Sequence, residues 1–248
     1  IRARHAQRTG GTQKVIGMLE VHLPKSRTPR IVAIFSYRHD AHLVPAMLKN
    51  IAPLVDGGIS YDDRASTEVF SHEPARRLKL LLAARDTGAQ WVLAIDPDER
   101  LDWLTRFSMQ RLMDGDADAY WFHLRELYTP RHFRVDGLWG QKRQARLLRL
   151  TDHIHMPGGH LHIPWQLFLS AQRLAPAGHN LYHLKMIDPA RRTARARLYE
   201  HLDPDHRMQA IGYKYLQDES GLQLQQIKPW RGYWPRHVDD GGLWMPKV

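Results

Sequence analysis

Two aspartates separated by one residue follow directly on an apolar run and are the first candidates for chemistry. Trp91 to Ile95 is wholly apolar, and Asp96-Pro97-Asp98-Glu99 comes next. Such a pair can reach one divalent cation, or can divide between a ribose hydroxyl and the metal. Hard oxygen ligands suit Mg²⁺ or Mn²⁺, which also hold diphosphate oxygens. The spacing indicates a metal site for a diphosphate-linked substrate, where the metal neutralises charge on a departing nucleoside diphosphate.

The same residues also fit a structural role. Asp96 could cap a following helix, and Asp98 and Glu99 could complement the positive end of that helix. A second carboxylate pair, Asp62-Asp63, follows another short predicted strand and precedes hydroxyl residues. Two acidic strand ends in one chain favour a binding site over a helix cap.

The elements that must position these carboxylates alternate along the chain. Apolar runs at 31–35 and 91–95 predict short buried strands, and Ile59-Ser60-Tyr61 predicts a second short strand between them. A helical stripe at 43–54 predicts one helix between them, and residues 74–88 predict another, with Pro74 in its first turn and Gly88 at its end.

This alternation predicts a mainly parallel sheet with helices on both faces. Ligands of such sheets bind at the carboxyl ends of the strands. Ser36 to Asp40, Asp62-Asp63 and Asp96 to Glu99 all fall at those ends. Ser36 and Arg38 are therefore predicted to face a bound donor, and Asp40 is placed to cap the next helix.

Four segments, in this order and spacing, resemble glycosyltransferase family 2. They are Ile31 to Tyr37, Tyr61 to Glu68, Arg76, and Ala94 to Arg100. The family pattern is a first strand, a second strand ending in an Asp-Asp-x-Ser-Thr turn, an Arg-containing helix and an Asp-x-Asp-Glu cluster. The resemblance is specific over residues 31–102 and suggestive over 145–217. It implies an α/β fold of GT-A type, with a Rossmann-like, mainly parallel sheet flanked by helices and a helical, irregular C-terminal region.

The resemblance also implies inverting sugar transfer and assigns roles to single residues. Asp62 or Asp63 would contact the nucleoside, and Arg76 would lie near the diphosphate. Asp96 would lie by the ribose, Asp98 would bind the metal, and His183 would complete the metal site. Arg64 stands where the family commonly has glycine, which implies a wider or differently aimed turn.

Histidines gather in the second half of the chain, around Pro157-Gly158-Gly159. Imidazoles can act as bases, metal ligands or hydrogen-bonded core groups. An inverting transfer needs a base within hydrogen-bond reach of the acceptor hydroxyl. The candidates are Asp136, Asp152, His160 and His162. His162 is favoured, with Asp152 as the second predicted catalytic residue; the resemblance places His155 or His162 on the acceptor side.

The C-terminal part contains two predicted helices, at 188–202 and 205–217. The first is rich in arginine and could bind a diphosphate or an anionic acceptor, or could present a solvated face. The aromatic residues of the tail could stack on sugar rings or hold the tail against the domain. They are Trp230, Tyr233, Trp234 and Trp244.

Three regions are expected along the chain. Residues 1–30 are basic and are predicted to be an arm or part of an adjoining region. Residues 31–220 are predicted to form the glycosyltransferase domain, with a nucleotide-sugar half at 31–125 and an acceptor half at 126–220. Residues 221–248 form an aromatic tail.

The composition narrows the possible functions. The 248 residues, 43% hydrophobic, can bury a full core. A net charge of +10 favours phosphate-bearing partners. The absence of cysteine excludes disulfide scaffolds, thiolate zinc sites and cysteine nucleophiles. No run approaches the roughly 20 apolar residues of a membrane-spanning helix, so the expected location is the cytoplasm, with the inner face of the membrane as an alternative.

We therefore expect a hexosyltransferase-type enzyme of polysaccharide biosynthesis. It would move a sugar from a nucleoside-diphosphate donor to a hydroxyl of a glycan, lipid or protein, with Mn²⁺ or Mg²⁺. Two alternatives stay open. The charge and the aromatic tail also fit a nucleic-acid-binding module, although no nucleic-acid partner is expected because the carboxylates would repel a phosphate backbone. The histidine cluster fits a His/Asp metal-dependent hydrolase.

Overall fold

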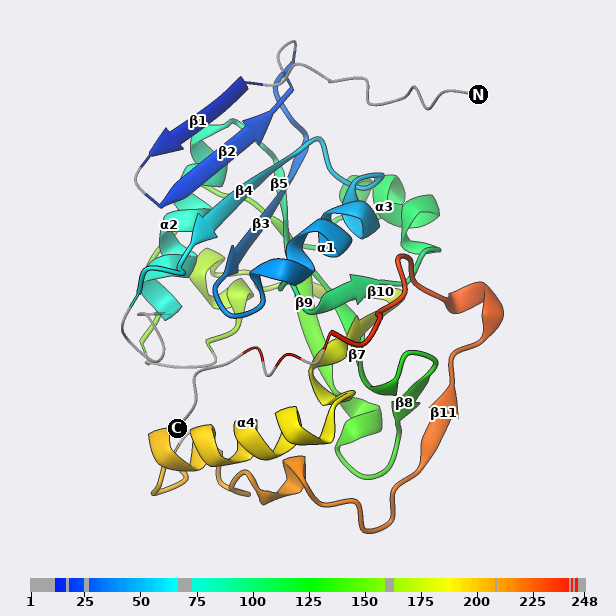
Figure 1. The fold of residues 1–248 in the computed structure, drawn as a ribbon. Helices are drawn as coiled ribbons and strands as arrows, with labels where there is room; N and C mark the ends of the chain where they lie inside the picture. The colour runs from blue at the N-terminus through cyan, green and yellow to red at the C-terminus, as the bar shows by residue number, and fades with distance from the viewer. Residues whose placement is uncertain are drawn as a thin grey trace, which may run out of the picture.

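A computed structural model describes residues 12–16, 18–24, 27–66, 73–158, 163–207, 209–240, 242 and 244 (Figure 1). The strands are β1 (Thr12–Ile16), β2 (Leu19–Leu23), β3 (Ile31–Tyr37), β4 (Gly57–Asp62), β5 (Trp91–Ala94), β6 (Glu99–Leu101), β7 (Ala119–Thr129), β8 (His132–Arg134), β9 (Arg143–Arg149), β10 (Leu174–His183) and β11 (Leu224–Gln226). The helices are α1 (Val44–Ile51), α2 (Glu73–Asp86), α3 (Thr105–Asp114) and α4 (Pro189–Leu202), and short 3₁₀ turns η1 to η6 lie between them.

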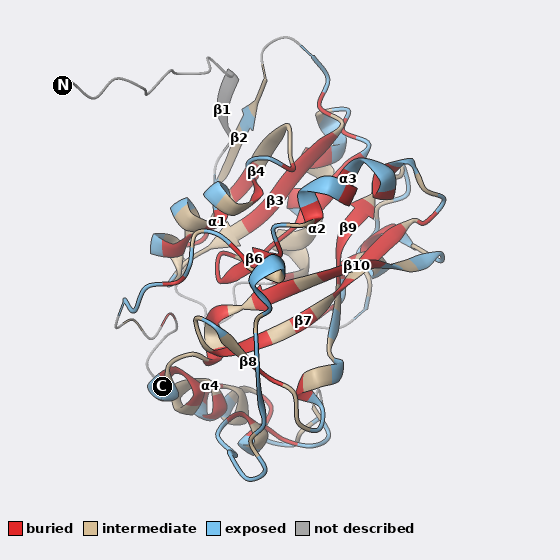
Figure 2. Ribbon diagram, turned by 90° about the vertical axis from the view of Figure 1, so that its right-hand side faces the viewer, coloured by how far each residue is buried: buried red, intermediate tan, exposed pale blue. Residues whose placement is uncertain are grey.

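The predicted strand–helix–strand–helix–strand unit is confirmed over residues 31–94. β3 pairs in parallel with β4 on one side and with β5 on the other. Successive residues of β3 point to opposite faces of the sheet, as a strand requires. Phe35 packs with Met47 and Ile51 of α1, whereas Ile34 packs with Leu80 of α2. Helices therefore cover both faces, and burial of those faces explains why the runs are continuously apolar (Figure 2).

The predicted fold class, a mainly parallel GT-A-type sheet, is wrong. The sheet runs in the order β1-β2-β4-β3-β5-β9-β7-β10-β6; off this path, β8 pairs with β7, and β11 pairs with β8. Of the ten pairings among the described strands, three are parallel and seven are antiparallel. The protein is a mixed α/β structure with a large, mostly antiparallel sheet.

The error has a physical origin, because the sequence pattern of a strand indicates its burial and not its direction. An apolar run shows that a strand is buried but does not show the direction of its neighbour. β9 enters the sheet between β5 and β7, antiparallel to both. At the other edge, β1 and β2 form an antiparallel hairpin within the basic segment 1–30, and β2 pairs with β4. The basic segment has no clear period, so the hairpin was not predicted, and nothing in the sequence fixes the direction in which β9 runs.

Several helix predictions can also be compared with the structure. The helix at 188–202 is confirmed, because α4 begins after Asp188, whose carboxylate accepts a hydrogen bond from the Ala190 amide at 2.7 Å. The helix at 205–217 is wrong; its described residues form turns and the short η5 (Lys214–Leu216). The cap at Asp40 is wrong as well, since its side chain makes no capping hydrogen bond to η1 (Ala41–Leu43). Among the described helices, none is long and apolar enough to cross a membrane.

Candidate functional site

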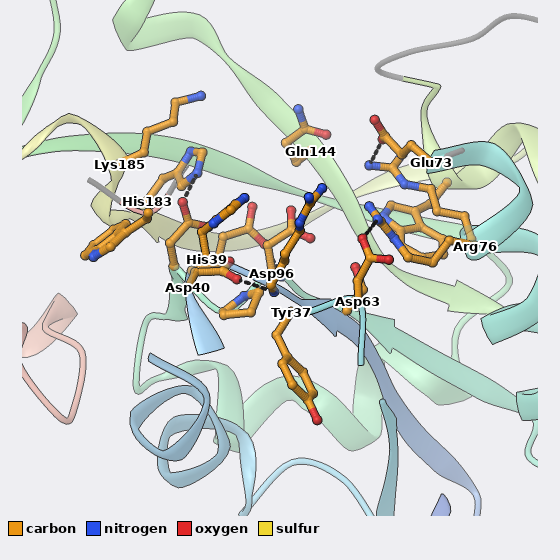
Figure 3. A pocket seen from close by; sticks show the side chains of 18 of the residues that line it. Tyr37, His39, Asp40, Asp63, Glu73, Arg76, Asp96, Gln144, His183 and Lys185 are labelled. Carbon is orange, nitrogen blue, oxygen red and sulfur yellow. Dashed lines mark hydrogen bonds and ion pairs between the residues drawn. The ribbon is translucent and has the colours of Figure 1, made fainter. Parts of the chain in front are cut away.

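A cleft of about 360 Å³ opens at the carboxyl ends of β3, β4 and β5, where α4 and the end of β10 form the opposite wall. Its lining is dominated by charged side chains. Six are acidic: Asp40, Asp63, Glu73, Asp96, Asp98 and Glu99. Six are basic: Arg38, Arg76, Arg77, Arg146, Lys185 and Arg195. In the close view, Asp63 and Arg76 lie to one side of Asp96, and His183 and Lys185 lie to the other (Figure 3).

The two aspartates after β4 have different surroundings. Asp63 is buried at the cleft wall, where Nη1 of Arg76 donates to its Oδ2 at 2.7 Å. Its own amide donates to the Tyr37 carbonyl at 3.0 Å, which fixes the turn against β3. Asp62 is not part of the cleft lining, and its carboxylate is bound by the exposed Arg64 side chain at 2.6 Å. The structure therefore separates two residues that the sequence left equivalent.

Asp96 and Glu99 share one buried cation. Nη2 of Arg146, on β9, lies 2.9 Å from Asp96 Oδ2 and 2.5 Å from Glu99 Oε1. Glu99 also accepts the Asp96 amide at 3.0 Å. The predicted alternative role, capping of a following helix by Asp96, does not apply, because α3 begins only at Thr105. Instead, Arg146 holds the turn and leaves the Asp96 side chain 38% exposed to the cleft.

Asp98 lies deeper in the cleft, against two cationic side chains. Its Oδ2 is 3.1 Å from Nε2 of His183 and 3.6 Å from Nη2 of Arg195. Burial alone would raise the pKa of Asp98, but His183 and Arg195 outweigh it and hold this pKa below its ordinary value. Burial would likewise lower the pKa of His183, but Asp98 and Glu126 raise it to about 9. The pair is therefore a carboxylate and an imidazolium at neutral pH.

Glu126 lies behind His183 and completes a buried charge cluster. Its Oε2 is 3.1 Å from His183 Nδ1, and its Oε1 is 3.3 Å from Lys185 and 3.6 Å from Lys142. Glu126 is fully buried. Burial would raise its pKa, but the three cations lower it well below the ordinary value. The carboxylate thus orients the imidazole so that Nε2 points to Asp98.

Asp40 is the acid of the cleft whose surroundings are mainly anionic. Its Oδ1 accepts the Arg38 amide at 3.0 Å. Burial and the negative charges of Asp98 and Asp96 raise the pKa of Asp40 to about 6. No described cation lies within ion-pair distance of its carboxylate. Asp40 can therefore gain or lose a proton close to neutral pH.

Asp98 and His183 are the side chains best placed to bind a metal. Asp98 offers a carboxylate oxygen, and Nε2 of His183, 3.1 Å away, becomes a ligand once a metal displaces its proton while Nδ1 still faces Glu126. Among the residues that the structure describes, no three His, Asp or Glu side chains are grouped to hold a metal alone. Mg²⁺ is commonly bound by one or two protein ligands together with substrate phosphates and water. The donor set fits a cation that takes its other ligands from a diphosphate.

The other predicted site residues divide into two groups. Ser36 and Arg38 line the cleft, as do Arg76, Asp96, Asp98 and His183. Asp152 is exposed on the loop before η3 (Trp165–Leu169) and is not part of the cleft lining. Asp136 is bound on both oxygens by the Arg134 guanidinium and is also outside it. The favoured base, His162, lies outside the described residues, as does His160.

Of the arginines predicted to make α4 a binding helix, one reaches the cleft. Arg195 lines it, whereas Arg191 is buried over the ring of Trp244, at 3.5 Å from the ring centre. Arg192 binds the Met186 carbonyl at 2.6 Å and Glu219. These contacts hold the helix in place, so the role of its basic side chains is partly structural.

Glu126 and Lys185 were not found by sequence reasoning. One signal was available for Glu126. In β7 the residues at even positions, such as Phe122 and Leu124, are buried, and Glu126 continues the same face. A carboxylate on an apolar strand face must have partners, because an unpaired buried charge is very costly. The partners themselves, which lie just before β9, at the end of β10 and just after it, could not be read from the pattern.

Comparisons with known proteins add no assignment to this geometry. No family model matches the chain, and no curated protein sequence is significantly similar to it.

Proposed function

We propose that the protein is a glycosyltransferase that moves a sugar from a nucleoside-diphosphate donor to an acceptor hydroxyl, with inversion. One observation carries the proposal: the ends of two strands, β4 and β5, bring Asp63, Asp96 and Asp98 into one cleft with Arg76, Lys185 and Arg195. Carboxylates suit the hydroxyl and amide groups of a nucleoside, and the cations suit a diphosphate.

The proposed step exchanges one bond for another at the anomeric carbon. The acceptor oxygen forms a bond to this carbon as the bond to the diphosphate oxygen breaks. The nucleoside diphosphate leaves with the electron pair of that bond, and the acceptor hydroxyl loses its proton to a base. Because negative charge grows on the leaving diphosphate, fixed cations near it lower the barrier.

Residues of the cleft divide these tasks. Asp63, held by Arg76, would bind the nucleoside, and Asp96 would bind the ribose from its exposed position. Arg195 and Lys185 would stabilise the charge on the departing diphosphate. Asp98 and His183 would hold a Mn²⁺ or Mg²⁺ ion, which when bound supplies further positive charge to the diphosphate oxygens.

Asp40 is the proposed proton acceptor in place of the residues expected from the sequence. Its carboxylate lines the cleft, and its raised pKa of about 6 suits a base that works near neutral pH. Asp152 lies outside the cleft lining and is not part of this proposal.

The acceptor class and the location rest on the same proposal. A glycan, lipid or protein hydroxyl would serve as acceptor in polysaccharide biosynthesis in the cytoplasm, at the inner face of the membrane for a lipid. A nucleic-acid-binding role is disfavoured for this cleft, because its six carboxylates nearly balance the positive charges of its six Arg and Lys side chains and of His183.

The test is a thermal-shift panel of UDP, GDP, dTDP and CMP, each with Mn²⁺ and with EDTA. We expect one nucleotide to raise the melting temperature more with Mn²⁺ than with EDTA. The corresponding nucleotide sugars are then screened for nucleoside-diphosphate release with and without glycan acceptors. If no nucleotide binds under either condition, the proposal fails; if one binds but phosphate is released without an acceptor, the protein is a hydrolase.

A further inference from the structure

Four large aromatic side chains are exposed on one part of the surface, away from the cleft lining. Their exposed fractions are 46% for Trp103, 71% for Phe107, 58% for Trp230 and 63% for Trp234. Single exposed apolar residues are ordinary, but a contiguous group of large ones marks an interaction surface.

Hydrogen bonds hold the two segments that carry these rings together. The Trp103 amide donates to the Gly232 carbonyl at 2.9 Å, and its indole donates to the Trp230 carbonyl at 2.8 Å. Nδ2 of Asn50, on α1, donates to the Trp234 carbonyl at 2.9 Å. The chain after β11 thus runs up the side of the molecule to the start of α3 (Figure 1).

One residue of the tail explains why the exposed rings are not needed to hold it. Tyr233, the residue before Trp234 in the chain, is buried. Its ring packs on Tyr182, and its hydroxyl donates to the Pro130 carbonyl at 3.1 Å. Trp244 is buried as well. The expected anchoring role therefore belongs to Tyr233 and Trp244, and Trp230 and Trp234 are left for another purpose.

The charges around the rings are positive. The Arg106 guanidinium lies 5.0 Å from the centre of the Trp103 ring and 4.5 Å from that of Phe107, and the Lys228 ammonium lies 5.7 Å from that of Trp230.

A pocket of about 210 Å³ is lined by Pro229 and Tyr233, the residues that precede Trp230 and Trp234 in the chain. Arg131, Lys228 and Arg236 line it, and its lining contains no carboxylate. Within the described part of the chain, none of these three cations has a carboxylate at ion-pair distance. A pocket with three cations of this kind is complementary to a phosphate group.

We propose that this aromatic–basic face, formed by Trp103, Arg106, Phe107, Trp230, Trp234 and the pocket of Arg131, Lys228 and Arg236, docks the protein on an anionic lipid bilayer. Indole rings favour the bilayer–water interface, where the apolar body and the N–H both find partners. Arginine and lysine beside them attract anionic headgroups, and the pocket would receive a headgroup phosphate. The inference goes beyond sugar transfer and does not depend on it.

The first experiment compares flotation of the whole chain with phosphatidylcholine vesicles and with vesicles that also contain phosphatidylglycerol. We expect binding to the anionic vesicles, with a blue shift of tryptophan fluorescence, and little binding to the neutral ones. The apolar arm pairs Phe107→Ser/Trp234→Ser with the control Met156→Ser/Ile211→Ser, which removes two similarly exposed apolar side chains on other elements. The charge arm pairs Arg106→Gln/Arg236→Gln with Arg85→Gln/Arg207→Gln.

In both arms the face variant should bind anionic vesicles about tenfold or more weakly, and its control should bind as the parent does. All four variants are compared by thermal unfolding, so that a folding defect is recognised. Equal weakening in the two charge variants would show only a general effect of the +10 charge and would overturn the proposal. It is also overturned if anionic vesicles do not bind at low salt, or if the parent is a dimer that the apolar face variant converts to a monomer.

Discussion

Nε2 of His183 lies 3.1 Å from Oδ2 of Asp98, although 85 positions separate the two residues in the chain. Asp98 belongs to the turn after β5, and His183 is the last residue of β10. β6 joins these segments, because its residue Glu99 pairs with His183 across the sheet. The contact is thus a consequence of strand register, and it unites the two residues proposed to bind a metal.

Substitution of Asp98 should separate metal binding from nucleotide binding. In Asp98→Asn we expect the Mn²⁺-dependent part of nucleotide stabilisation to disappear and turnover to fall by about 100-fold or more. Nucleotide binding in EDTA should persist, because Asp63 and Arg76 lie elsewhere in the cleft. Titration calorimetry with Mn²⁺ and with EDTA measures the Mn²⁺-dependent and the metal-independent parts of nucleotide binding. Unchanged Mn²⁺ dependence in the variant would remove Asp98 from the metal site.

Asp63 and Asp62 form a matched pair for testing the nucleoside site. Asp63→Asn should weaken nucleotide binding by about tenfold, because it removes a charged acceptor and the ion pair that positions it. Asp62→Asn should bind nucleotide as the parent does, since its carboxylate faces Arg64 outside the cleft lining. Isothermal titration of both variants in EDTA is the measurement. A larger loss in Asp62→Asn would reverse the assignment.

Asp40→Asn should impair turnover while stabilising the fold. The folded-state pKa of Asp40 is raised to about 6, above its unfolded value, so its ionisation costs stability as the pH rises through 6. The variant should gain about 2 kcal/mol over the parent at pH 8 in EDTA, and nothing below about pH 4. Turnover should fall about 100-fold or more if this carboxylate is the base.

Urea unfolding across pH measures the stability change, with the exposed Asp205→Asn as control. The parent's turnover should rise with pH through about 6, since the base must be ionised. A variant that keeps both full turnover and the parental pH profile would exclude Asp40 as the base.

Glu126→Gln should strongly destabilise the protein. The pKa of Glu126 is lowered in the folded state, so its ion pairs stabilise the fold above the unfolded pKa and are lost as the pH falls through the folded one. Removal of the carboxylate leaves His183, Lys142 and Lys185 without their shared anion and should cost about 3 to 5 kcal/mol at pH 7.

The control for this change is Glu200→Gln, where a half-exposed carboxylate pairs with His206 at 2.8 Å. It should cost less than about 1 kcal/mol. Denaturant unfolding at pH 7 and at pH 3 compares the two, and the difference between Glu126→Gln and the parent should shrink at the lower pH. If the two variants lost equal free energy of unfolding at pH 7, a buried charge cluster that depends on Glu126 would be contradicted.

The sequence by itself determined the first three parallel strands and the carboxylates at their ends. These features are local: an apolar run makes a buried strand, and the polar residue that follows must lie at its end. The same local logic correctly predicted α4 with its cap at Asp188, and the anchoring of part of the aromatic tail. The family resemblance, rather than local pattern, identified Asp98 and His183 as candidates for one site.

Only the tertiary structure decided the direction of the later strands, and with it the fold class. Period and apolarity do not encode which strand will pair with β5, so the antiparallel entry of β9 was not predicted. That pairing delivers Arg146 to Asp96 and Glu99. Tertiary contacts also decide that Asp63, and not Asp62, lines the cleft. They likewise leave Asp152 outside the cleft lining. Such contacts follow from packing and register, which residue types alone do not specify.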